Sequence, residues 1–262
     1  MRLSIFVSTM RMQGEALIDR LRAEGLPVSF INQCDTNGVR EVRGLKVFDI
    51  NERGLSRSRN AALDRADGDL LWLCDDDLIF APDCEETILR AFSERPDADA
   101  LMFEVVCETE GRKNRPIGEE HTLAISNAMR YPTFQYVFRT EFLKKTGIRF
   151  DTRFGSGSEY SSGEDSLFTA ALLRAGAKIT AVPQTVARVE HTDSAWFRGF
   201  DEKYRHDKGA LFRCLFGRKY LPYCALMLYR HKEWRSGKGF LSALGDMRRG
   251  AKSLKKQPFT EN

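Results

Sequence analysis

A short apolar run that ends in three consecutive acids limits what this chain can fold into more than any other feature. Leu70–Cys74 is apolar throughout and has the length of a buried strand, and Asp75, Asp76 and Asp77 follow it directly. Adjacent carboxylates repel one another and are costly to remove from water. A positive partner should offset that repulsion, and a divalent metal bound through oxygen ligands is the usual one. The run therefore favours a metal-using enzyme.

Strands and helices alternate through the first hundred residues, which is typical of an α/β protein. The expected strands are residues 3–9, 28–31, 45–50, 70–74, 100–107 and 178–182, and the expected helices are 14–24, 54–65, 83–95 and 165–175. Such a sheet is mostly parallel, and its ligands bind where the strands end. The three acids lie at such an end, so we expect a site to form around them.

The stretches between these elements carry their own expectations. The residues after the second strand, through Gly38, are typical of a polar loop, and residues 108–120 of a charged loop that could close over a site. Asp83 and Glu86 match a capping box for the helix that follows them. The stretch 125–147 mixes aromatic and polar residues and predicts no single element.

Charge is distributed unevenly along the chain. Residues 196–262 hold 16 Lys and Arg against 6 Asp and Glu, a balance of +10, while residues 1–195 hold 25 against 31, a balance of −6. We therefore expect a catalytic domain over 1–195 and a helical, basic extension over 196–262. Such an extension suggests contact with an anionic surface, and a solvated helical face is the alternative. At a membrane each basic residue would contribute roughly 1 kcal/mol, and Phe240, Leu241 and Leu244 would add an apolar contact.

Several classes of protein are not expected. No apolar run approaches the roughly 18 residues of a membrane span, and the N-terminus lacks the cleavage site of a signal peptide. The six cysteines form no CxxC pair, which favours unlinked thiols in a reducing compartment, a cytoplasmic location and no zinc site. No motif for DNA or RNA is visible, so nucleic acid is not an expected partner.

A second acidic motif opens the predicted helix at 165–175. Glu164 and Asp165 follow Gly163, and a helix N-terminus stabilises negative charge by about 0.3–1 kcal/mol. Helix capping is one interpretation of these acids. The other is that Asp165 is a general base, because burial beside a second carboxylate would raise its pKa as a base requires.

Two further motifs could contribute to the same site. His191 follows the late strand and the turn at Pro183, and metal ligation and a structural role are equal alternatives for it. Arg59 and Asn60 lie near the start of a predicted helix, where basic and amide groups suit a phosphate or a nucleotide. A surface helix with a serine cap is the alternative.

Taken together, these motifs resemble those of an inverting family 2 glycosyltransferase with the GT-A fold. The resemblance covers roughly residues 1–200 and lies in Gly54-Leu-Ser-x-x-Arg59-Asn60, Asp75-x-Asp77, Gly163-Glu164-Asp165 and His191. The continuation, Trp196-Phe-x-Gly-Phe with Lys203-Tyr and Lys208-Gly-Ala-Leu-Phe, resembles enzymes of bacterial surface-polysaccharide synthesis.

The resemblance implies a role for each motif. A nucleotide-diphosphate sugar, with a UDP-sugar favoured, would contact Ser8, Thr9, Asn32, Gln33, Asp35, Arg59, Asn60, Asp75 and Asp76. Asp75, Asp77 and His191 would hold Mn²⁺ or Mg²⁺. Asp165, with Glu164 beside it, would deprotonate a hydroxyl of a glycan or lipid-linked acceptor. Many relatives carry an acidic pair where this chain has Asn32-Gln33, but an amide can also bind a uracil edge.

Two other functions stay open on the sequence. A sugar-1-phosphate nucleotidyltransferase also places acids at the edge of an α/β sheet, but it needs a glycine-rich basic loop after the first strand, which Ser8–Gly14 matches weakly. A non-catalytic module could use the basic extension to bind a membrane or another anion. For the enzyme, the expected location is the cytoplasm, with peripheral contact at the inner face of the cell membrane.

Overall fold

A computed structural model gives the fold and describes residues 1–262 except 13–15, 24, 108–115, 129–130, 190–198 and 255–262. The chain divides into two compact units. The larger unit consists of Met1–Thr152 and Glu164–Ser194, and the smaller unit of Arg153–Gly163 and Ala195–Asn262. The smaller unit therefore includes an internal segment that interrupts the sequence of the larger one.

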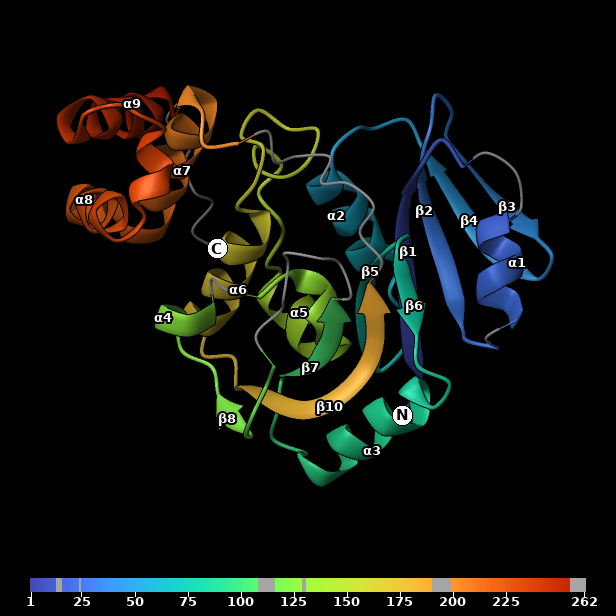
Figure 1. Ribbon diagram of the computed structural model, residues 1–262. Helices are drawn as coiled ribbons and strands as arrows, with labels where there is room; N and C mark the ends of the chain where they lie inside the picture. Colours follow the sequence, from blue (N-terminus) through green and yellow to red (C-terminus); the bar gives the residue numbers. More distant parts are fainter. Residues whose placement is uncertain (13–15, 24, 108–115, 129–130, 190–198, 255–262) are drawn as a thin grey trace. The chain divides into compact units, whose positions relative to one another are not determined.

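One mixed sheet forms the centre of the larger unit (Figure 1). The described residues contribute ten strands to it: β1 (Leu3–Met10), β2 (Val28–Gln33), β3 (Gly38–Val42), β4 (Leu45–Ile50), β5 (Leu70–Asp75), β6 (Leu78–Phe80), β7 (Ala100–Cys107), β8 (His121–Thr122), β9 (Tyr136–Arg139) and β10 (Ile179–Val189). Their order across the sheet is β3-β4-β2-β1-β5-β9-β7-β10-β6, with β8 beside β10.

Helices pack on both faces of this sheet. The helices in the described part of the larger unit are α1 (Ala16–Ala23), α2 (Leu55–Arg65), α3 (Cys84–Glu94), α4 (Ile125–Ala128), α5 (Thr140–Thr146) and α6 (Glu164–Arg174), with a 3-10 turn, η1 (Thr133–Gln135). Buried residues of α1 and α3 join one hydrophobic cluster, and those of α2, α5 and α6 join another. The predicted α/β architecture, a sheet flanked by helices, is confirmed.

The strands that carry the predicted site are parallel neighbours. β4, β2, β1 and β5 lie side by side in the same direction. Their register pairs Ser8 with Asp75 and Thr9 with Asn32. The polar residues that follow three apolar strands therefore meet at one edge of the sheet. β9 runs antiparallel to β5 and β7, so the sheet is mixed although its first half is mainly parallel.

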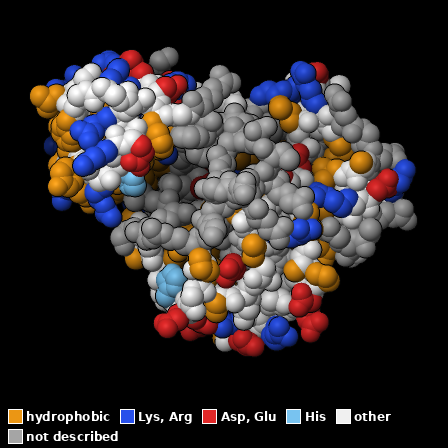
Figure 2. All heavy atoms as spheres, viewed as in Figure 1, with side chains coloured by type: hydrophobic (Ala, Val, Ile, Leu, Met, Phe, Trp, Pro, Cys, Tyr) orange, Lys and Arg blue, Asp and Glu red, His pale blue; other side chains and the backbone are white. Residues whose placement is uncertain are grey.

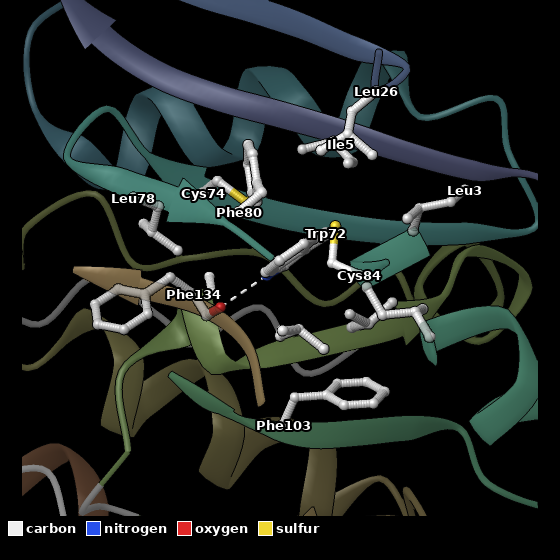
Figure 3. Packing of buried hydrophobic residues seen from close by; sticks show 14 of the residues in the cluster. Leu3, Ile5, Leu26, Trp72, Cys74, Leu78, Phe80, Cys84, Phe103 and Phe134 are labelled. Atoms are coloured by element: carbon white, nitrogen blue, oxygen red, sulfur yellow. Dashed lines mark hydrogen bonds between the residues drawn. The ribbon is translucent and has the colours of Figure 1, made fainter. Parts of the chain in front are cut away.

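β5 lies in the interior of the sheet, as its apolar sequence predicts. Trp72 is fully buried, packs edge-on against Phe80 at 5.0 Å between ring centroids, and donates its indole N–H to the Phe134 carbonyl oxygen at 2.7 Å (Figure 3). Leu71 and Leu73 point into the opposite cluster. A strand covered on both faces is rigid, and this one delivers Asp75 to the edge of the sheet from a fixed position.

Four of the strands were not expected from the sequence: β3, β6, β8 and β9. Gly38–Val42, the end of the predicted polar loop and the residues after it, forms β3 at the edge of the sheet, antiparallel to β4. Gly38, Val39, Arg40 and Glu41 are exposed, so they have no apolar alternation by which a strand could be recognised. Pairing with the preformed edge of β4 makes this segment a strand.

Two local predictions differ from the structure. Asp83 precedes α3 without capping its backbone, so the predicted capping box with Glu86 does not form; the carboxylate accepts a long bond, 3.5 Å, from the Thr87 hydroxyl instead. The late strand continues past Pro183 to Val189 as β10. Its pairing with β7 shifts register between Ala181 and Thr185, because proline has no N–H to donate to the ladder.

The smaller unit is helical, as predicted for the extension. It contains α7 (Glu202–Phe216), η2 (Gly217–Lys219), α8 (Tyr220–Arg230), η3 (Lys232–Arg235) and α9 (Phe240–Ser253). A Cβ at Gly209 would lie 1.8 Å from the Met247 carbonyl oxygen, and one at Gly250 equally close to the His206 carbonyl oxygen. Only glycine therefore allows α7 and α9 to approach this closely.

A buried ion pair and an internal loop complete the smaller unit. Arg205 Nε lies 2.7 Å from Asp246 Oδ2, and both side chains are almost fully buried. Asp207 accepts hydrogen bonds of 2.9 Å from the Ser161 amide and from its hydroxyl. The segment Arg153–Gly163 is thereby fixed to α7.

None of the helices in the described ranges has the length and apolar character needed to cross a bilayer. The six cysteines form no disulfide, as their spacing predicts.

Candidate active site

The predicted site lies where strands β1, β2 and β5 end. Asp75 is the last residue of β5 and lies beside Ser8 of β1. Two helices bring their N-terminal turns to the same edge: α2 carries Arg59, and α6 begins with Glu164 and Asp165. The site is therefore assembled from segments that are far apart in the sequence.

Arg59 holds these segments together. Its side chain is only 2% exposed. Nη1 lies 2.6 Å from Asp165 Oδ1 and 3.8 Å from Glu164 Oε1, and Nη2 lies 3.4 Å from Asp75 Oδ1. The sequence predicted that a cation would offset the acids after β5, and the structure supplies one in this guanidinium.

The charges shift the pKa of Asp75 and of Arg59. Burial raises the pKa of Asp75 to about 6, against the opposing charge of Arg59. Asp77, Asp165 and Asp76 add to the increase. Burial alone would lower the pKa of Arg59, but the surrounding carboxylates outweigh it and the pKa is raised. The guanidinium therefore stays charged, while Asp75 beside it is easier to protonate than an ordinary aspartate.

Glu164 lies deeper than Asp165. Burial raises the pKa of Glu164, the charge of Asp165 adds to this increase, and Arg59 opposes it. The Asp165 side chain keeps 25% of its surface exposed, whereas that of Glu164 keeps 9%. Of the two adjacent acids, Asp165 is the one that an external hydroxyl can reach.

Thr133 contributes to this site although no sequence motif marked it. It is a buried residue of η1, and its hydroxyl donates to Asp165 Oδ1 at 2.5 Å. Arg59 binds the same oxygen. In the described part of the chain no group donates to Oδ2 of Asp165, so one oxygen is fixed and the other is available.

Asn60 and Phe150 support Arg59 from behind. Asn60 donates to the Phe150 carbonyl oxygen and accepts from the Phe150 amide, both at 2.9 Å. The Arg59 guanidinium lies over the Phe150 ring at 5.5 Å, and that ring stacks on Phe168 at 3.9 Å. The residues predicted to bind a nucleotide, Arg59 and Asn60, thus have partners within the protein, and a ligand would have to displace those bonds.

Asn32 also has internal partners. Its side-chain oxygen accepts from the Met12 amide at 3.0 Å, and its nitrogen donates to Asp49 Oδ1 at 2.6 Å. Arg40 completes the group with a 2.7 Å bond to the other oxygen of Asp49. The amide that was predicted to bind a base edge therefore ties β1 and β4 to β2.

The other predicted nucleotide contacts lie along the same edge in different environments. Ser8 is half-buried, and its hydroxyl accepts from the Ser58 hydroxyl at 2.8 Å. Thr9 and Gln33 are buried, and Oε1 of Gln33 has no hydrogen-bond partner among the described residues. Asp35 is exposed and bonded to Arg53.

The acids after Asp75 form a turn. Asp76 and Asp77 lie between β5 and β6, with Asp76 exposed and Asp77 half-buried. In an extended strand Asp75 and Asp77 would lie on the same side, but the turn after Asp75 removes that alternation. Asp77 is nevertheless close enough to raise the pKa of Asp75.

The predicted metal site is described only in part. His191, its third predicted ligand, lies outside the described residues. Among those that are described, no three His, Cys, Asp or Glu side chains form a group that could hold a metal ion. Asp75 and Asp77 still fit a hard cation chemically, because they offer carboxylate oxygens whose mutual repulsion a divalent ion would relieve.

Comparison with known protein families gave a match over part of the chain. The family described as glycosyl transferase family 2 matches residues 37–160, which include Arg59, Asp75, Asp77 and Thr133. The chain contains a family 2 glycosyltransferase domain. Two of the motifs that the sequence suggested, Arg59-Asn60 and Asp75-x-Asp77, therefore fall within a recognised domain, whereas Glu164-Asp165 and His191 lie beyond the matched residues. The fold is GT-A. A sequence comparison with curated proteins gave no match.

Solved structures share the fold of this glycosyltransferase. A crystal structure of S. aureus TarS 1-349 in complex with UDP-GlcNAc superposes with a TM-score of 0.64 at 17% identity, over 96% of this chain and 82% of that one. The same TarS fragment in complex with UDP gives 0.62 at 19% identity, over 94% and 80%. Against the longer S. aureus TarS the TM-score is 0.65 at 18% identity, and the glycosyltransferase spans 49% of that chain.

Proposed function

We propose that this glycosyltransferase transfers a sugar from a UDP-sugar to a hydroxyl of a glycan or lipid-linked acceptor in bacterial surface-polysaccharide synthesis. Nucleotide-sugar transfer follows from the family. The observation that supports the finer assignment is the position of Asp75 and Asp165 on one guanidinium, that of Arg59. The acids at the end of β5 would then bind the diphosphate of the sugar donor. The base at the start of α6 would deprotonate the acceptor hydroxyl that attacks the same sugar.

Asp165 is the proposed general base. Arg59 and Thr133 hold Oδ1, so Oδ2 faces the acceptor and takes its proton. The acceptor oxygen forms a bond to the anomeric carbon as the bond from that carbon to the diphosphate oxygen breaks, and the electron pair leaves with the diphosphate. One displacement inverts the anomeric carbon. A positioned carboxylate contributes typically about 10²–10⁴ in rate.

Asp75 and Asp77 are the proposed ligands of Mn²⁺ or Mg²⁺, with His191 as a third. When bound, such an ion neutralises the charge that develops on a departing diphosphate. The raised pKa of Asp75 supports this role, because a carboxylate destabilised by its neighbours gains from a nearby cation. Arg59 would then balance the negative charge of Glu164 and Asp165.

The nucleotide is proposed to lie along the ends of β1 and β2. The partnerless, buried Oε1 of Gln33 supports this placement, because such an oxygen is costly to leave without a donor and the N–H of a uracil ring would satisfy it. TarS has been crystallised with UDP and with UDP-GlcNAc, which favours a uridine nucleotide here as well.

The decisive experiment identifies the donor and the bond that is broken. We expect UDP, among the nucleoside diphosphates, to raise the melting temperature most, and Mn²⁺ to increase the shift. Incubation with the matching UDP-sugar and acceptor should release UDP. Release of pyrophosphate from a sugar 1-phosphate and UTP would instead identify a nucleotidyltransferase, and the absence of both would favour a binding module.

The smaller unit is proposed to keep the enzyme near its acceptor. Its positive balance suits the inner face of a membrane, where lipid-linked acceptors lie and where each basic residue contributes roughly 1 kcal/mol. The proposed location is therefore cytoplasmic, with peripheral membrane contact.

A further inference from the structure

Helix α8 has an apolar surface on the side that the smaller unit leaves exposed. Its inner side packs Cys224 and Leu228, both fully buried. On the other side Leu226 and Tyr229 are exposed to 47% and 73%, and Leu221, in the first turn of the helix, is exposed to 36%. A helix that is apolar all round is normally buried on every side, so the outer side of α8 is unusual for a surface helix.

These residues form one surface because of helix geometry. Pro222, Leu226 and Tyr229 are exposed and follow one another at intervals of four and three, so they lie on one side of the helix, with Leu221 at the border of that side. Tyr223 is 41% exposed at the margin. Isolated apolar residues are common on protein surfaces, but contiguous ones mark an interaction site. We call Leu221, Tyr223, Leu226 and Tyr229 the α8 surface.

Basic residues flank the α8 surface at both ends. Arg218 and Lys219 precede the helix, and Arg230, Lys232 and Arg235 end or follow it. None of these five forms an ion pair with any residue that the structure describes. The only acid between 217 and 235 is Glu233, which bonds to His231. Figure 2 shows orange apolar side chains beside blue basic ones over this part of the molecule.

We propose that the α8 surface docks the enzyme on an anionic lipid bilayer. Apolar side chains between unpaired cations match the layered chemistry of such a membrane, with acyl chains beneath phosphate groups. The two tyrosines add amphipathic rings suited to the boundary. An 11-residue helix is too short to span a bilayer, so α8 lies in the plane of the membrane.

A second copy of the chain suits this surface less well. A symmetric dimer through α8 would place the same patch on both subunits, and their basic residues would face each other without acids to neutralise them. Lipid phosphates supply the missing negative charge.

This inference rests on the membrane contact proposed above and names a different segment for it. The sequence pointed to Phe240, Leu241 and Leu244. Of these only Leu241 is largely exposed, at 80%, whereas Phe240 and Leu244 are partly buried. The α8 surface, with Leu241 beyond it, therefore offers the larger apolar contact.

The test measures binding of the full chain to vesicles of phosphatidylcholine with 30% phosphatidylglycerol. We expect the protein to sediment with these vesicles, to bind pure phosphatidylcholine at least tenfold more weakly, and to detach as salt increases. Leu226→Glu with Tyr229→Glu should weaken binding at least tenfold. Replacing Arg218, Lys219 and Arg230 by Gln should weaken it similarly while leaving the apolar residues intact.

Val39→Glu is the matched control, because Val39 is 69% exposed on the edge strand of the larger unit; it should leave binding unchanged. Vesicle binding that survives both α8 variants would overturn the role of α8 while leaving a membrane contact elsewhere. If the wild-type protein does not bind the vesicles, membrane docking is refuted as well.

Oligomeric state is measured by sedimentation velocity. A dimer in the wild type that becomes a monomer in the Glu variants would assign the surface to self-association. UDP release with a water-soluble acceptor reports on the proposed chemistry separately, since the α8 substitutions lie outside the site.

Discussion

Arg59 Nη1 donates to Asp165 Oδ1 at 2.6 Å, although the two residues are 106 positions apart in the sequence. The bond joins the first turns of α2 to the start of α6 and orients the proposed base. The guanidinium of Arg59 therefore supplies a positive charge next to Asp75, Glu164 and Asp165. The predictions below follow from this arrangement.

Replacing Arg59 by Met should both destabilise the enzyme and abolish transfer. Loss of the guanidinium leaves Asp75, Glu164 and Asp165 close together and uncompensated, and removal of one partner from a buried ion pair costs about 3–5 kcal/mol. Urea unfolding at pH 8 measures this loss. Arg57→Met is the control: Arg57 is a half-buried residue of the same helix that contacts Glu52 and Arg53 instead of the acidic group, so its loss should change the free energy of unfolding much less. An Arg59→Met protein as stable as the wild type would contradict the central role of the ion pair.

Asp165→Asn should keep donor binding and lose transfer. The amide retains the shape of the carboxylate but cannot accept the acceptor's proton, so we expect the rate constant for transfer to fall by about 10²–10⁴. Calorimetric titration with UDP and a coupled assay of UDP release separate the two effects. Asp97→Asn, at an exposed acid, should behave as wild type. Weakened UDP binding with full turnover would remove Asp165 from the role of base.

Thr133 should act as a positioning residue for Asp165. Thr133→Val removes the hydroxyl that donates to Oδ1, and a hydrogen bond to a charged group is worth about 1.5–3 kcal/mol. We expect turnover to fall about tenfold or more with UDP affinity unchanged, because the proposed base is no longer held in position. Thr133→Ser should restore turnover. A Thr133→Val enzyme with wild-type turnover would mean that the contact is only structural.

Glu164 should make stability depend on pH in a way that Glu164→Gln removes. Its folded-state pKa is raised from 4.5 to about 7 by burial, so the folded protein favours the protonated acid. The resulting stability is fully present below pH 4.5 and is lost as pH rises through about 7. The Gln variant should therefore be more stable than wild type at pH 8, by about 1–3 kcal/mol, and nearly equal at pH 4. Urea unfolding at both values measures the difference, and a Gln variant that is less stable at pH 8 would refute the shift.

Asp77→Ala should abolish activity together with any response to Mn²⁺. Removing a carboxylate from a proposed pair of ligands weakens the site for a divalent ion. Activity is measured after treatment with a chelator and again after titration with Mn²⁺ or Mg²⁺. Full wild-type turnover in excess chelator would mean that Arg59 alone balances the leaving diphosphate.

The sequence predicts the parts of this protein that local pattern controls. The apolar run of β5 and the acidic start of α6 were found because each is a continuous feature with a physical reason, a buried strand and a helix N-terminus. The exposed β3 was missed because its residues show no alternation, and its strand form comes from pairing with β4. This pairing is a tertiary contact, and a short stretch of sequence carries no information about it.

The same limit applies within the site. Arg59 was noticed, but its partners were predicted to be phosphates because the residues that surround it come from distant segments. Thr133 could not be found, since one threonine in an aromatic-rich stretch carries no signal until η1 brings it beside Asp165. Asn32 stays a predicted ligand residue, and the bonds of its amide to Met12 and Asp49 could not be seen in the sequence. Sequence pattern identified the acids, and the structure identified what holds them in place.

The internal segment Arg153–Gly163 makes the smaller unit impossible to remove with a single cut. A chain truncated at residue 195 would keep this segment but discard its supports: Ser161 would lose Asp207, and Tyr160 would lose Ser253. The loosened stretch ends one peptide bond before Glu164, where α6 and the proposed base begin. A variant made for crystallisation or for domain exchange must therefore change residues 153–163 and residues 195–262 together. Exchanging only the C-terminal piece for that of a relative would disturb the start of α6 from outside the site.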